Sequence, residues 1–221
     1  MATNTDPAGP WSLVVPLKPL ARAKSRLARA AGEDARPRLA LAFAQDTVAA
    51  ALACSRVRDV VVVTDDAVAA AALSALGARI VPDAPGAGLN AALAHGARSV
   101  RALRPAAPVA ALNADLPALR TGELARVLDF ASAFPNAFLR DAAGIGTTFL
   151  TAAGGAEFRP AFGGPSGARH LASGAVEIAL SGVDSVRRDV DTGEDLRVAL
   201  ALGVGSHTAR IATAPAPSRD R

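Results

Sequence analysis

Several residue types are scarce in this chain of 221 residues, and each scarcity excludes a class of protein. The single Cys54 permits no internal disulfide and no cysteine-based metal cluster, and its Ala-rich surroundings favour a small core residue over a nucleophile. Tyrosine is absent and aromatic residues make up 4% of the chain, which leaves few platforms on which nucleic-acid bases could stack. The arginines are scattered along the chain. The sequence therefore indicates that nucleic acid is not a partner.

Long apolar runs are also missing. No stretch approaches the roughly 20 apolar residues that a membrane-spanning helix needs. The segment Met1–Pro7 lacks the basic start and the apolar stretch of a signal peptide. We therefore expect a folded cytoplasmic protein without a membrane partner.

Lysine is the third scarce residue type. Of the 24 basic residues only Lys18 and Lys24 are lysines, and both follow the first apolar run. An ammonium group is a compact point charge that can follow phosphate oxygens, whereas a guanidinium is a planar fork. The two lysines therefore indicate a phosphate site, with chance survival on a solvated turn as the alternative. The net charge of +4 suits a small polyanionic substrate.

Apolar runs alternate with stretches of helical period over the first 133 residues. The expected strands are 13–15, 59–64, 78–81 and 109–113, and the expected helices are 35–54, 66–76, 89–103 and 121–133. Continuous hydrophobicity within the runs indicates parallel strands that are buried on both faces. This alternation predicts an α/β fold, a single Rossmann-like three-layer domain with a mostly parallel central sheet. The domain is expected over residues 11–210, with flexible ends at 1–10 and 211–221.

The pattern changes after residue 135. Strands are expected at 136–141, at 147–151 and at Val183–Val190, and Thr192 is expected to cap a last helix that ends at Leu202. A short helix ending at Ser173 follows a loop rich in glycine and proline.

Three aspartates lie where this fold would place ligands. Asp115 follows the fourth strand, at the carboxyl edge of the sheet, although it could simply end the strand. Strand alternation would point Asp189 and Asp191 to the same side, where two carboxylates repel unless a cation such as Mg²⁺ lies between them. Alternatively, Asp191 caps a helix and Asp189 pairs with a neighbouring arginine. Combined with the lysines, the three carboxylates favour a Mg²⁺–triphosphate site.

Two glycine-containing loops could bind an anion. Gly144–Thr148 and Phe162–Ser166 bring backbone N–H groups together with the hydroxyls of Thr147 and Ser166, although both could be ordinary turns. On the following helix, Arg169 and His170 either support an acidic substrate or lie at the surface.

The remaining polar candidates are less specific. Asn90 lies near a helix N-terminus, where its amide either recognises a nucleotide or caps the helix. His95 and His207 have no neighbouring metal-ligand partners in the sequence. The loop from Lys18 to Arg26 lacks the glycine spacing of a P-loop, which argues against an ATPase.

Six motifs occur in a fixed order along the chain: Val-Pro-Leu-Lys18 with Ala-Lys24-Ser-Arg26-Leu, Gly88-Leu-Asn90, Asp115-Leu-Pro, Gly-Ile-Gly146-Thr147-Thr, Phe-Gly163-Gly-Pro-Ser166-x-x-Arg-His170 and Asp189-Val-Asp191-Thr. In this order they resemble the guanylyltransferases of deazaflavin coenzyme F(420) biosynthesis, the 2-phospho-L-lactate or phosphoenolpyruvate guanylyltransferases. Ile145 departs from the family pattern, which would have a small or hydroxyl residue between the two glycines.

The resemblance implies a nucleotidyltransferase fold of the GT-A type. It also implies transfer of GMP from GTP onto the phosphate of a three-carbon phospho-acid, with release of pyrophosphate. Phosphoenolpyruvate would give enolpyruvyl-diphospho-guanosine; 2-phospho-L-lactate and 3-phospho-D-glycerate are the alternative acceptors. A downstream enzyme that takes the unstable product is a candidate partner.

The resemblance further implies a role for each matching residue. Asp115, Asp189 and Asp191 would bind Mg²⁺, and Thr147, Gly163 and Ser166 would hold the phospho-acid. Lys18, Lys24 and Arg26 would hold the triphosphate from the side opposite the carboxylates, with Asn90 also on the nucleotide. Lys18, Lys24 and Asp115 would be the catalytic residues.

Two rival functions remain open. A sugar-phosphate or molybdenum-cofactor nucleotidyltransferase would need more aromatic and carboxamide groups in the acceptor loops. A catalytically silent nucleotide-binding module would have no use for three aspartates.

Overall fold

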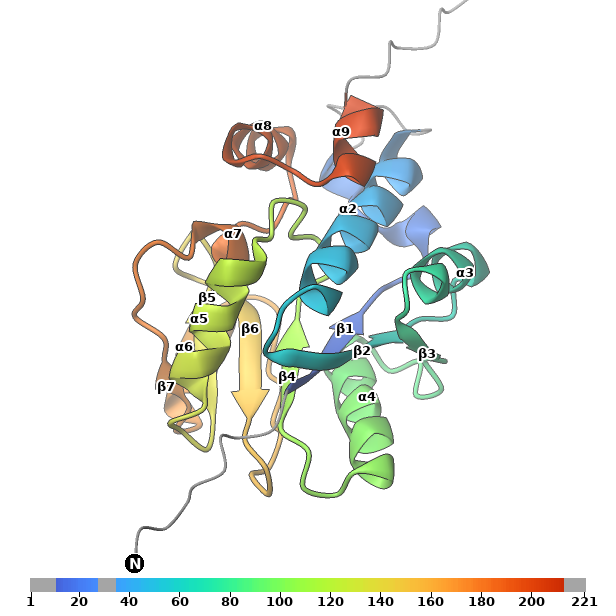
Figure 1. Cartoon of the computed structure of the whole chain (residues 1–221). Helices are drawn as coiled ribbons and strands as arrows, with labels where there is room; N and C mark the ends of the chain where they lie inside the picture. Colours follow the sequence, from blue (N-terminus) through green and yellow to red (C-terminus); the bar gives the residue numbers. More distant parts are fainter. Residues whose placement is uncertain (1–10, 28–34, 213–221) are drawn as a thin grey trace, which may run out of the picture.

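The structure, a computed structural model, describes residues 11–27 and 35–212, without the side chain of Ser25. The described strands form one seven-stranded sheet in the order β3-β2-β1-β4-β6-β5-β7 (Figure 1). The strand bounds are β1 Trp11–Pro16, β2 Val57–Val63, β3 Arg79–Val81, β4 Val109–Leu112, β5 Ala137–Arg140, β6 Thr147–Ala152 and β7 Val176–Glu177.

The described helices alternate with these strands over the first half of the chain. The α-helices are α2 Ala35–Leu52, α3 Ala67–Ala75, α4 Leu89–Leu103, α5 Thr121–Ala131, α6 Ser166–Ala172, α7 Asp184–Arg187, α8 Gly193–Leu202 and α9 Ser206–Ala212. Two short 3₁₀ turns, η1 Leu20–Arg22 and η2 Ser25–Leu27, follow β1. Among the described residues, none of the helices combines the length and the apolar character needed to cross a membrane.

The sheet is mostly parallel, as predicted. Strand β1 pairs in parallel with both β2 and β4, β2 with β3, and β5 with β7. Strand β6 runs antiparallel to its two neighbours, β4 and β5. The amino end of β6 therefore lies at the same edge of the sheet as the carboxyl ends of β1 and β4.

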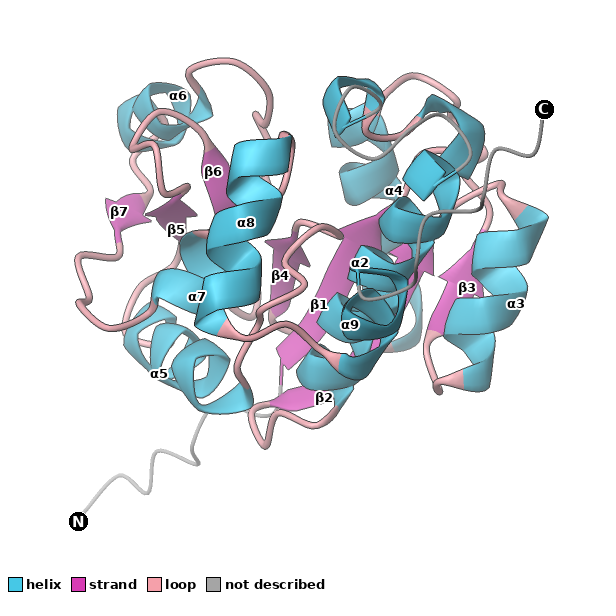
Figure 2. Ribbon diagram, turned by 90° about the horizontal axis from the view of Figure 1, so that it is seen from above, coloured by secondary structure: helices cyan, strands magenta, loops and turns pink. Residues whose placement is uncertain are grey.

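The central strands are buried on both faces because consecutive side chains of a strand point to opposite sides. Leu13 and Val15 of β1 belong to an apolar cluster with α2 and α5, whereas Val14 belongs to another with α4. Seen from above, α4 and α6 lie on one side of the sheet, and α2, α5, α7, α8 and α9 lie on the other (Figure 2). This arrangement confirms the three layers predicted from the continuous hydrophobicity.

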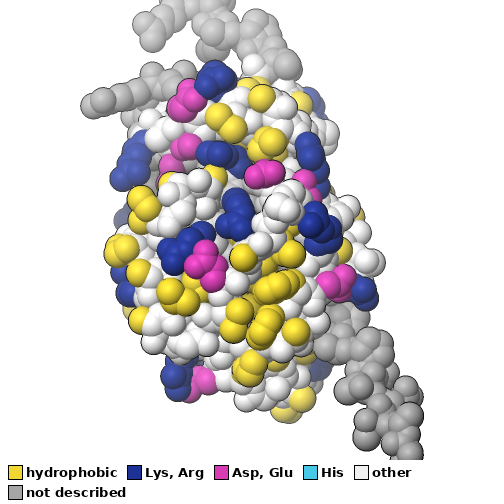
Figure 3. Space-filling model, turned by 90° about the vertical axis from the view of Figure 1, so that its left-hand side faces the viewer, with side chains coloured by type: hydrophobic (Ala, Val, Ile, Leu, Met, Phe, Trp, Pro, Cys, Tyr) yellow, Lys and Arg dark blue, Asp and Glu magenta, His cyan; other side chains and the backbone are white. Residues whose placement is uncertain are grey.

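Charged side chains of both signs are mixed on one face of the molecule. On the face shown in Figure 3, basic side chains lie among acidic and apolar ones and form no continuous basic stripe. This pattern agrees with the scattered arginines of the sequence.

The C-terminal third differs from the prediction. The strand predicted over Val183–Val190 is wrong: the segment contains the short helix α7, and no strand passes through it. Its buried valines are Val183, Val186 and Val190, which are spaced by three and four residues as on a helix. Strand alternation would have required a spacing of two.

The last predicted helix is confirmed as α8, but it is not the last helix. Thr192 and Asp195 form a reciprocal capping box at its start. After it comes α9, whose first backbone N–H groups at His207 and Thr208 donate to the carboxylate of Asp46 on α2. Residues 211 and 212 belong to α9; the rest of the two predicted flexible ends lies outside the described residues.

Candidate active site

A cleft of about 640 Å³ opens at the carboxyl ends of β1 and β4. The strand order reverses here, because β2 and β3 lie on one side of β1 while β4 lies on the other. Such a crevice is where open α/β sheets bind ligands. The predicted site residues that line it are Lys18, Lys24, Arg26, Asp115, Thr147, Gly163, Ser166, Asp189 and Asp191.

The loop after β1 forms one wall of the cleft. Hydrogen bonds from two sides fix the conformation of this loop. The backbone N–H of Leu20 donates to Asp66 at 2.9 Å. Arg36 of α2 donates to the carbonyls of Ala21 and Ala23. Lys24 is in the left-handed region, with φ of 56°, which a non-glycine residue seldom adopts. The loop is thus held in a conformation that turns the Lys24 side chain inward, while Lys18 stays exposed at the rim.

The three aspartates come together from two segments. Asp115 follows β4 and is held there by a hydrogen bond from the Leu116 N–H to the buried Thr47 hydroxyl at 3.0 Å. The Val190 N–H donates to the Asp115 carbonyl at 3.0 Å, so buried Val190 fixes its neighbours Asp189 and Asp191 beside Asp115. The sequence correctly predicted that the three aspartates lie together, although the strand alternation from which it derived the pair was wrong.

Lys24 lies among these carboxylates, not opposite them as predicted. Its Nζ is paired with Asp115 and lies 2.8 Å from Asp191, and its side chain is 11% exposed. Burial lowers the pKa of the Lys24 ammonium, but Asp115 and Asp191 outweigh burial and hold that pKa above its ordinary value. Lys24 therefore stays charged and offsets part of the negative charge of the three carboxylates.

The crowding of these charges makes the Asp189 carboxyl group harder to ionise. Burial, followed by the charges of Asp115 and Asp191, raises the pKa of Asp189 to about 7. One lysine thus does not balance the three acids, and a further cation would be stabilised here.

The donor set fits a hard divalent cation. Asp115 Oδ1 is buried and has no hydrogen-bond partner among the described residues. Oxygen ligands of this kind suit Mg²⁺ or Mn²⁺, which commonly take one or two carboxylates and complete their shell with substrate phosphates and water. Within the described part of the chain, no three acidic, histidine or cysteine side chains form a ready-made metal cage. Lys24 lies between the carboxylates, so they would hold a metal only with the phosphates of a ligand.

The raised pKa of Asp189 gives a stability prediction. Between about pH 4 and 7 the folded protein retains a proton that the unfolded chain has lost, so this contribution to stability disappears as the pH rises through 7. In EDTA, Asp189→Asn is expected to raise the unfolding free energy at pH 8 by about 1–2 kcal/mol, after allowing for solvent screening. At pH 5 the unfolded chain has already lost the proton while the folded protein keeps it, so the gain there is expected to be less than half as large. Urea unfolding at both pH values measures this. Asp129→Asn on exposed α5 is the control, and an equal effect of Asp189→Asn at both pH values would contradict the assignment.

The opposite wall of the cleft contains the two glycine loops. The carboxylate of Asp141, directly after β5, accepts the N–H groups of Ile145 and Gly146 at 2.9 and 2.8 Å. The Ile145 carbonyl accepts the N–H of Gly167 in α6 at 3.1 Å, which ties the first loop to the second. The Ile145 side chain itself is 60% exposed. Thr147, Gly163 and Ser166 meet at this wall, as predicted.

Gly146 tolerates no side chain. A Cβ at this position would overlap the Asp141 carboxylate, which cannot move without losing its two backbone donors. Gly146→Ala is expected to displace the loop and to raise KM for the ligand bound there by about 10- to 100-fold. Steady-state kinetics would measure this, with Gly122→Ala on α5 as the matched control, since open space surrounds that glycine. An unchanged KM would show that the loop takes no part in binding.

Residues 11–212 match the family described as Guanylyl transferase CofC like. The chain belongs to this family. The match extends over both walls of the cleft, and it confirms the resemblance seen in the six motifs.

Two curated relatives of this family member cover nearly its whole length. A protein from Streptomyces coelicolor named phosphoenolpyruvate guanylyltransferase is 71% identical over 202 residues, which cover 91% of this chain and 95% of the relative. A protein of the same name from Streptomyces avermitilis is 68% identical over 214 residues, which cover 96% and 99%.

A solved structure shares the fold. A putative nucleotide-diphospho-sugar transferase from Desulfovibrio desulfuricans G20 superposes with a TM-score of 0.68 at 16% identity, covering 91% of this chain and 93% of that one. This likeness confirms the predicted GT-A type of α/β fold for the CofC-like chain.

The nucleotide role of Asn90 stays a prediction. In the structure its amide is bonded to the acceptor loop: Nδ2 donates to the Phe162 carbonyl at 3.1 Å, and Oδ1 accepts the Phe162 N–H at 2.8 Å. Asn90 thereby fixes the loop Phe162–Gly164 against α4. It is not among the residues that line the cleft.

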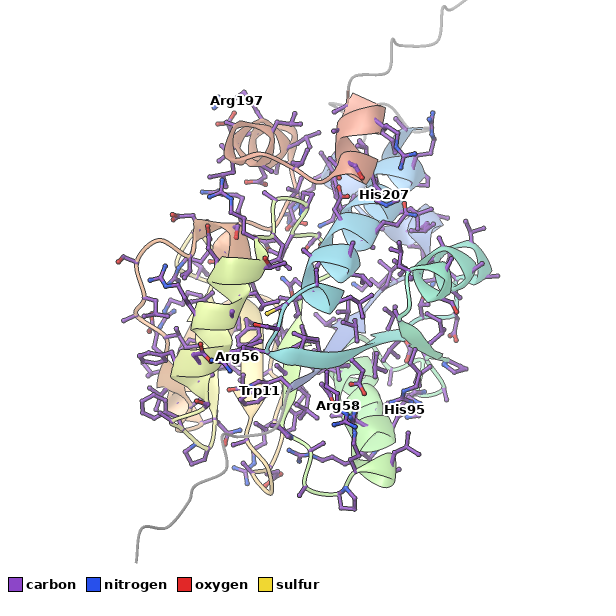
Figure 4. The ribbon with its side chains drawn as sticks, in the orientation of Figure 1. Trp11, Arg56, Arg58, His95, Arg197 and His207 are labelled. Atoms are coloured by element: carbon purple, nitrogen blue, oxygen red, sulfur yellow. The ribbon has the colours of Figure 1, made fainter. Side chains whose placement is uncertain are left out.

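Two open questions about α6 are answered by the structure of this family member. His170 is fully buried, so the surface interpretation is wrong for it. Arg169 donates to the carbonyls of Ala161 and Gly163 and so closes the same loop from outside. His95 on α4 and His207 on α9 lie far apart in Figure 4.

Three polar residues of the cleft have no role assigned from the sequence: Arg22, Asn113 and Asp141. Asp141 had a readable signal, because an acidic residue between a strand and a Gly-x-Gly loop is a natural acceptor for the loop's N–H groups. Arg22 had none, since it is one of many arginines in the chain.

Proposed function

We propose that the protein transfers GMP from GTP onto the phosphate of phosphoenolpyruvate, giving enolpyruvyl-diphospho-guanosine and pyrophosphate in coenzyme F(420) biosynthesis. One observation carries the proposal: a single cleft has a lysine and carboxylate wall facing a wall of hydroxyls and glycine amides. The first wall suits a triphosphate and the second a small acid, so the two substrates would meet between them. The names of the two relatives support phosphoenolpyruvate as the acceptor.

The reaction needs no nucleophilic side chain from the protein. A phosphate oxygen of the acceptor attacks the α-phosphorus of GTP, and the bond from that phosphorus to the leaving pyrophosphate breaks. The task of the protein is to hold two polyanions together and to neutralise the charge that develops on the leaving group. The chain would do this with Lys18, Lys24 and Arg26 on the triphosphate and with Thr147, Gly163 and Ser166 on the acceptor.

A divalent cation is part of the proposal. Asp115, Asp189 and Asp191 would hold it, and it would supply electrostatic neutralisation of the triphosphate. Lys24 lies against Asp115 and Asp191 in the ligand-free structure, and its ammonium is within the same cleft as the expected phosphates. Its charge would therefore be available to the leaving pyrophosphate. Mg²⁺ is the cation that we expect.

The direct test offers GTP and Mg²⁺ with each of three acids, phosphoenolpyruvate, 2-phospho-L-lactate and 3-phospho-D-glycerate, and measures pyrophosphate. We expect release with phosphoenolpyruvate and much less with the other two. A preference for either other acid would change the acceptor and leave the guanylyl transfer standing. No release with any of them would overturn the proposed function.

Two alternative functions predict different experimental results. A silent nucleotide-binding module would bind GTP in calorimetry but release no pyrophosphate with any acceptor. A different nucleotidyltransferase would release pyrophosphate only with a sugar phosphate or another acceptor. Among the described residues that line the cleft there is one carboxamide, Asn113, and one aromatic ring, Phe162, which is little for recognising a sugar.

A further inference from the structure

His170 is locked in place behind the acceptor wall. It lies in α6 with no exposed surface, and its ring packs against those of Phe138 and Phe162, with centroids 5.7 and 5.2 Å away. Both ring nitrogens have partners. A buried histidine held on all sides has one orientation, and its protonation can be worked out from those partners.

The tautomer follows from a backbone donor. The Ala161 N–H lies 3.0 Å from Nε2 and can only donate, so Nε2 must present a lone pair. Burial, assisted by the charge of Arg169, lowers the pKa of His170 to about 4, so the ring is neutral at neutral pH. The single ring proton is therefore on Nδ1.

That proton is directed at Thr147. His170 Nδ1 lies 3.0 Å from the Thr147 hydroxyl oxygen, and the Ser166 hydroxyl donates to the same oxygen at 3.1 Å. A hydroxyl oxygen has two lone pairs, and these two donors occupy both. The proton of the Thr147 hydroxyl is left without a partner in this cluster, and Thr147 lines the cleft.

We propose that His170 is a positioning residue that, through its Nδ1 proton, fixes the Thr147 hydroxyl as a hydrogen-bond donor to an anionic oxygen of the phospho-acid acceptor. The proposal rests on the proposed function for the identity of the acceptor. A free threonine hydroxyl rotates and can present either its proton or its lone pairs. With both lone pairs occupied, Thr147 presents only its proton, which favours an anion and disfavours a neutral ligand that offers a donor.

Two variants separate the two ring nitrogens. The amide of Gln reaches the position of Nε2, so His170→Gln keeps an acceptor for the Ala161 N–H and loses the donor to Thr147. The amide of Asn reaches the position of Nδ1, so His170→Asn can keep that donor. His170→Gln is expected to raise KM for the acceptor by about tenfold, consistent with weakening a hydrogen bond to a charged group, and to leave KM for GTP unchanged. His170→Asn should restore most of the loss, and His95→Gln is the control.

A merely structural role for His170 predicts a different result. In that case both variants would lose activity with GTP and acceptor alike, and the effect of His170→Gln would add to that of Thr147→Val. The proposal predicts non-additivity, because His170 cannot position a hydroxyl that Thr147→Val has removed. Equal rises in both KM values, or additive effects, would overturn it.

The tautomer of His170 can be measured in the unaltered protein, so the proposal remains testable even if a His170 variant fails to fold. Nitrogen-15 NMR at pH 7.5 should show His170 protonated at Nδ1, with its signals assigned by comparison with His95→Gln and His207→Gln. A proton on Nε2 would overturn the inference. Failure of the proposed function would show differently, as an unaltered enzyme that releases no pyrophosphate with any phospho-acid.

Discussion

Replacement of Asp189 by alanine is expected to lower kcat/KM for pyrophosphate release by about 10³-fold or more, since metal-assisted neutralisation is worth several kcal/mol. Asp189 shares the cleft with Asp115 and Asp191, and crowding with these carboxylates raises its pKa to about 7. The ionised form of Asp189 is therefore unfavourable in the empty cleft, and a bound cation would stabilise it. The measurement is pyrophosphate release at saturating GTP with Mg²⁺ varied from micromolar to tens of millimolar.

A fold defect would be a different explanation for that loss, and stability separates the two. Asp189→Ala is expected to lose activity, whereas Asp189→Asn, which removes the crowded charge, is expected to raise the unfolding free energy in EDTA at pH 8. Asp129→Ala, which removes an exposed carboxylate from α5, should retain full activity. Retained pyrophosphate release in Asp189→Ala would remove Asp189 from the metal site.

Replacement of Lys24 by arginine is expected to lower kcat by about 10²-fold, although the charge is kept. The Lys24 ammonium fits between Asp115 and Asp191 with 11% of its side chain exposed, and its backbone is already in a conformation unusual for a residue with a Cβ. A planar guanidinium is larger and would separate the two segments that hold the carboxylates. Steady-state kinetics with GTP and the acceptor varied in turn would measure the loss.

Lys18 provides the matched comparison, because it lies in the same loop and lines the same cleft but is exposed at the rim. There is room for a guanidinium at that position. Lys18→Arg is therefore expected to reduce kcat by no more than about threefold. Small effects of both substitutions would mean that charge alone matters, and that the two lysines survived by chance in an arginine-rich chain.

Much of the fold could be predicted because its signals are local. Val60 to Val63 form a continuous apolar run, and such a run indicates a strand buried on both faces. The failures have local causes as well. The strand prediction over Val183–Val190 overlooked the helical spacing of Val183, Val186 and Val190.

The site could be predicted in its composition but not in its geometry. The sequence placed Asp115 at the carboxyl edge of the sheet and Asp189 and Asp191 on one side of a predicted strand, and combined the three with the lysines into one Mg²⁺–triphosphate site. It could not show that Lys24 lies among them, since that depends on one residue with positive φ. The burial of His170 depends on contacts with Phe138 and Phe162, which no spacing in α6 reveals.

Phosphorus-31 NMR of the products formed from GTP, phosphoenolpyruvate and Mg²⁺ tests the central claim most directly. If the two walls of the cleft bring the α-phosphorus of GTP to the acceptor's phosphate, the spectrum will show two coupled signals of an unsymmetrical diphosphate together with pyrophosphate. Neither should form with Asp189→Ala. Formation of GDP and inorganic phosphate, or complete recovery of both substrates, would contradict the account.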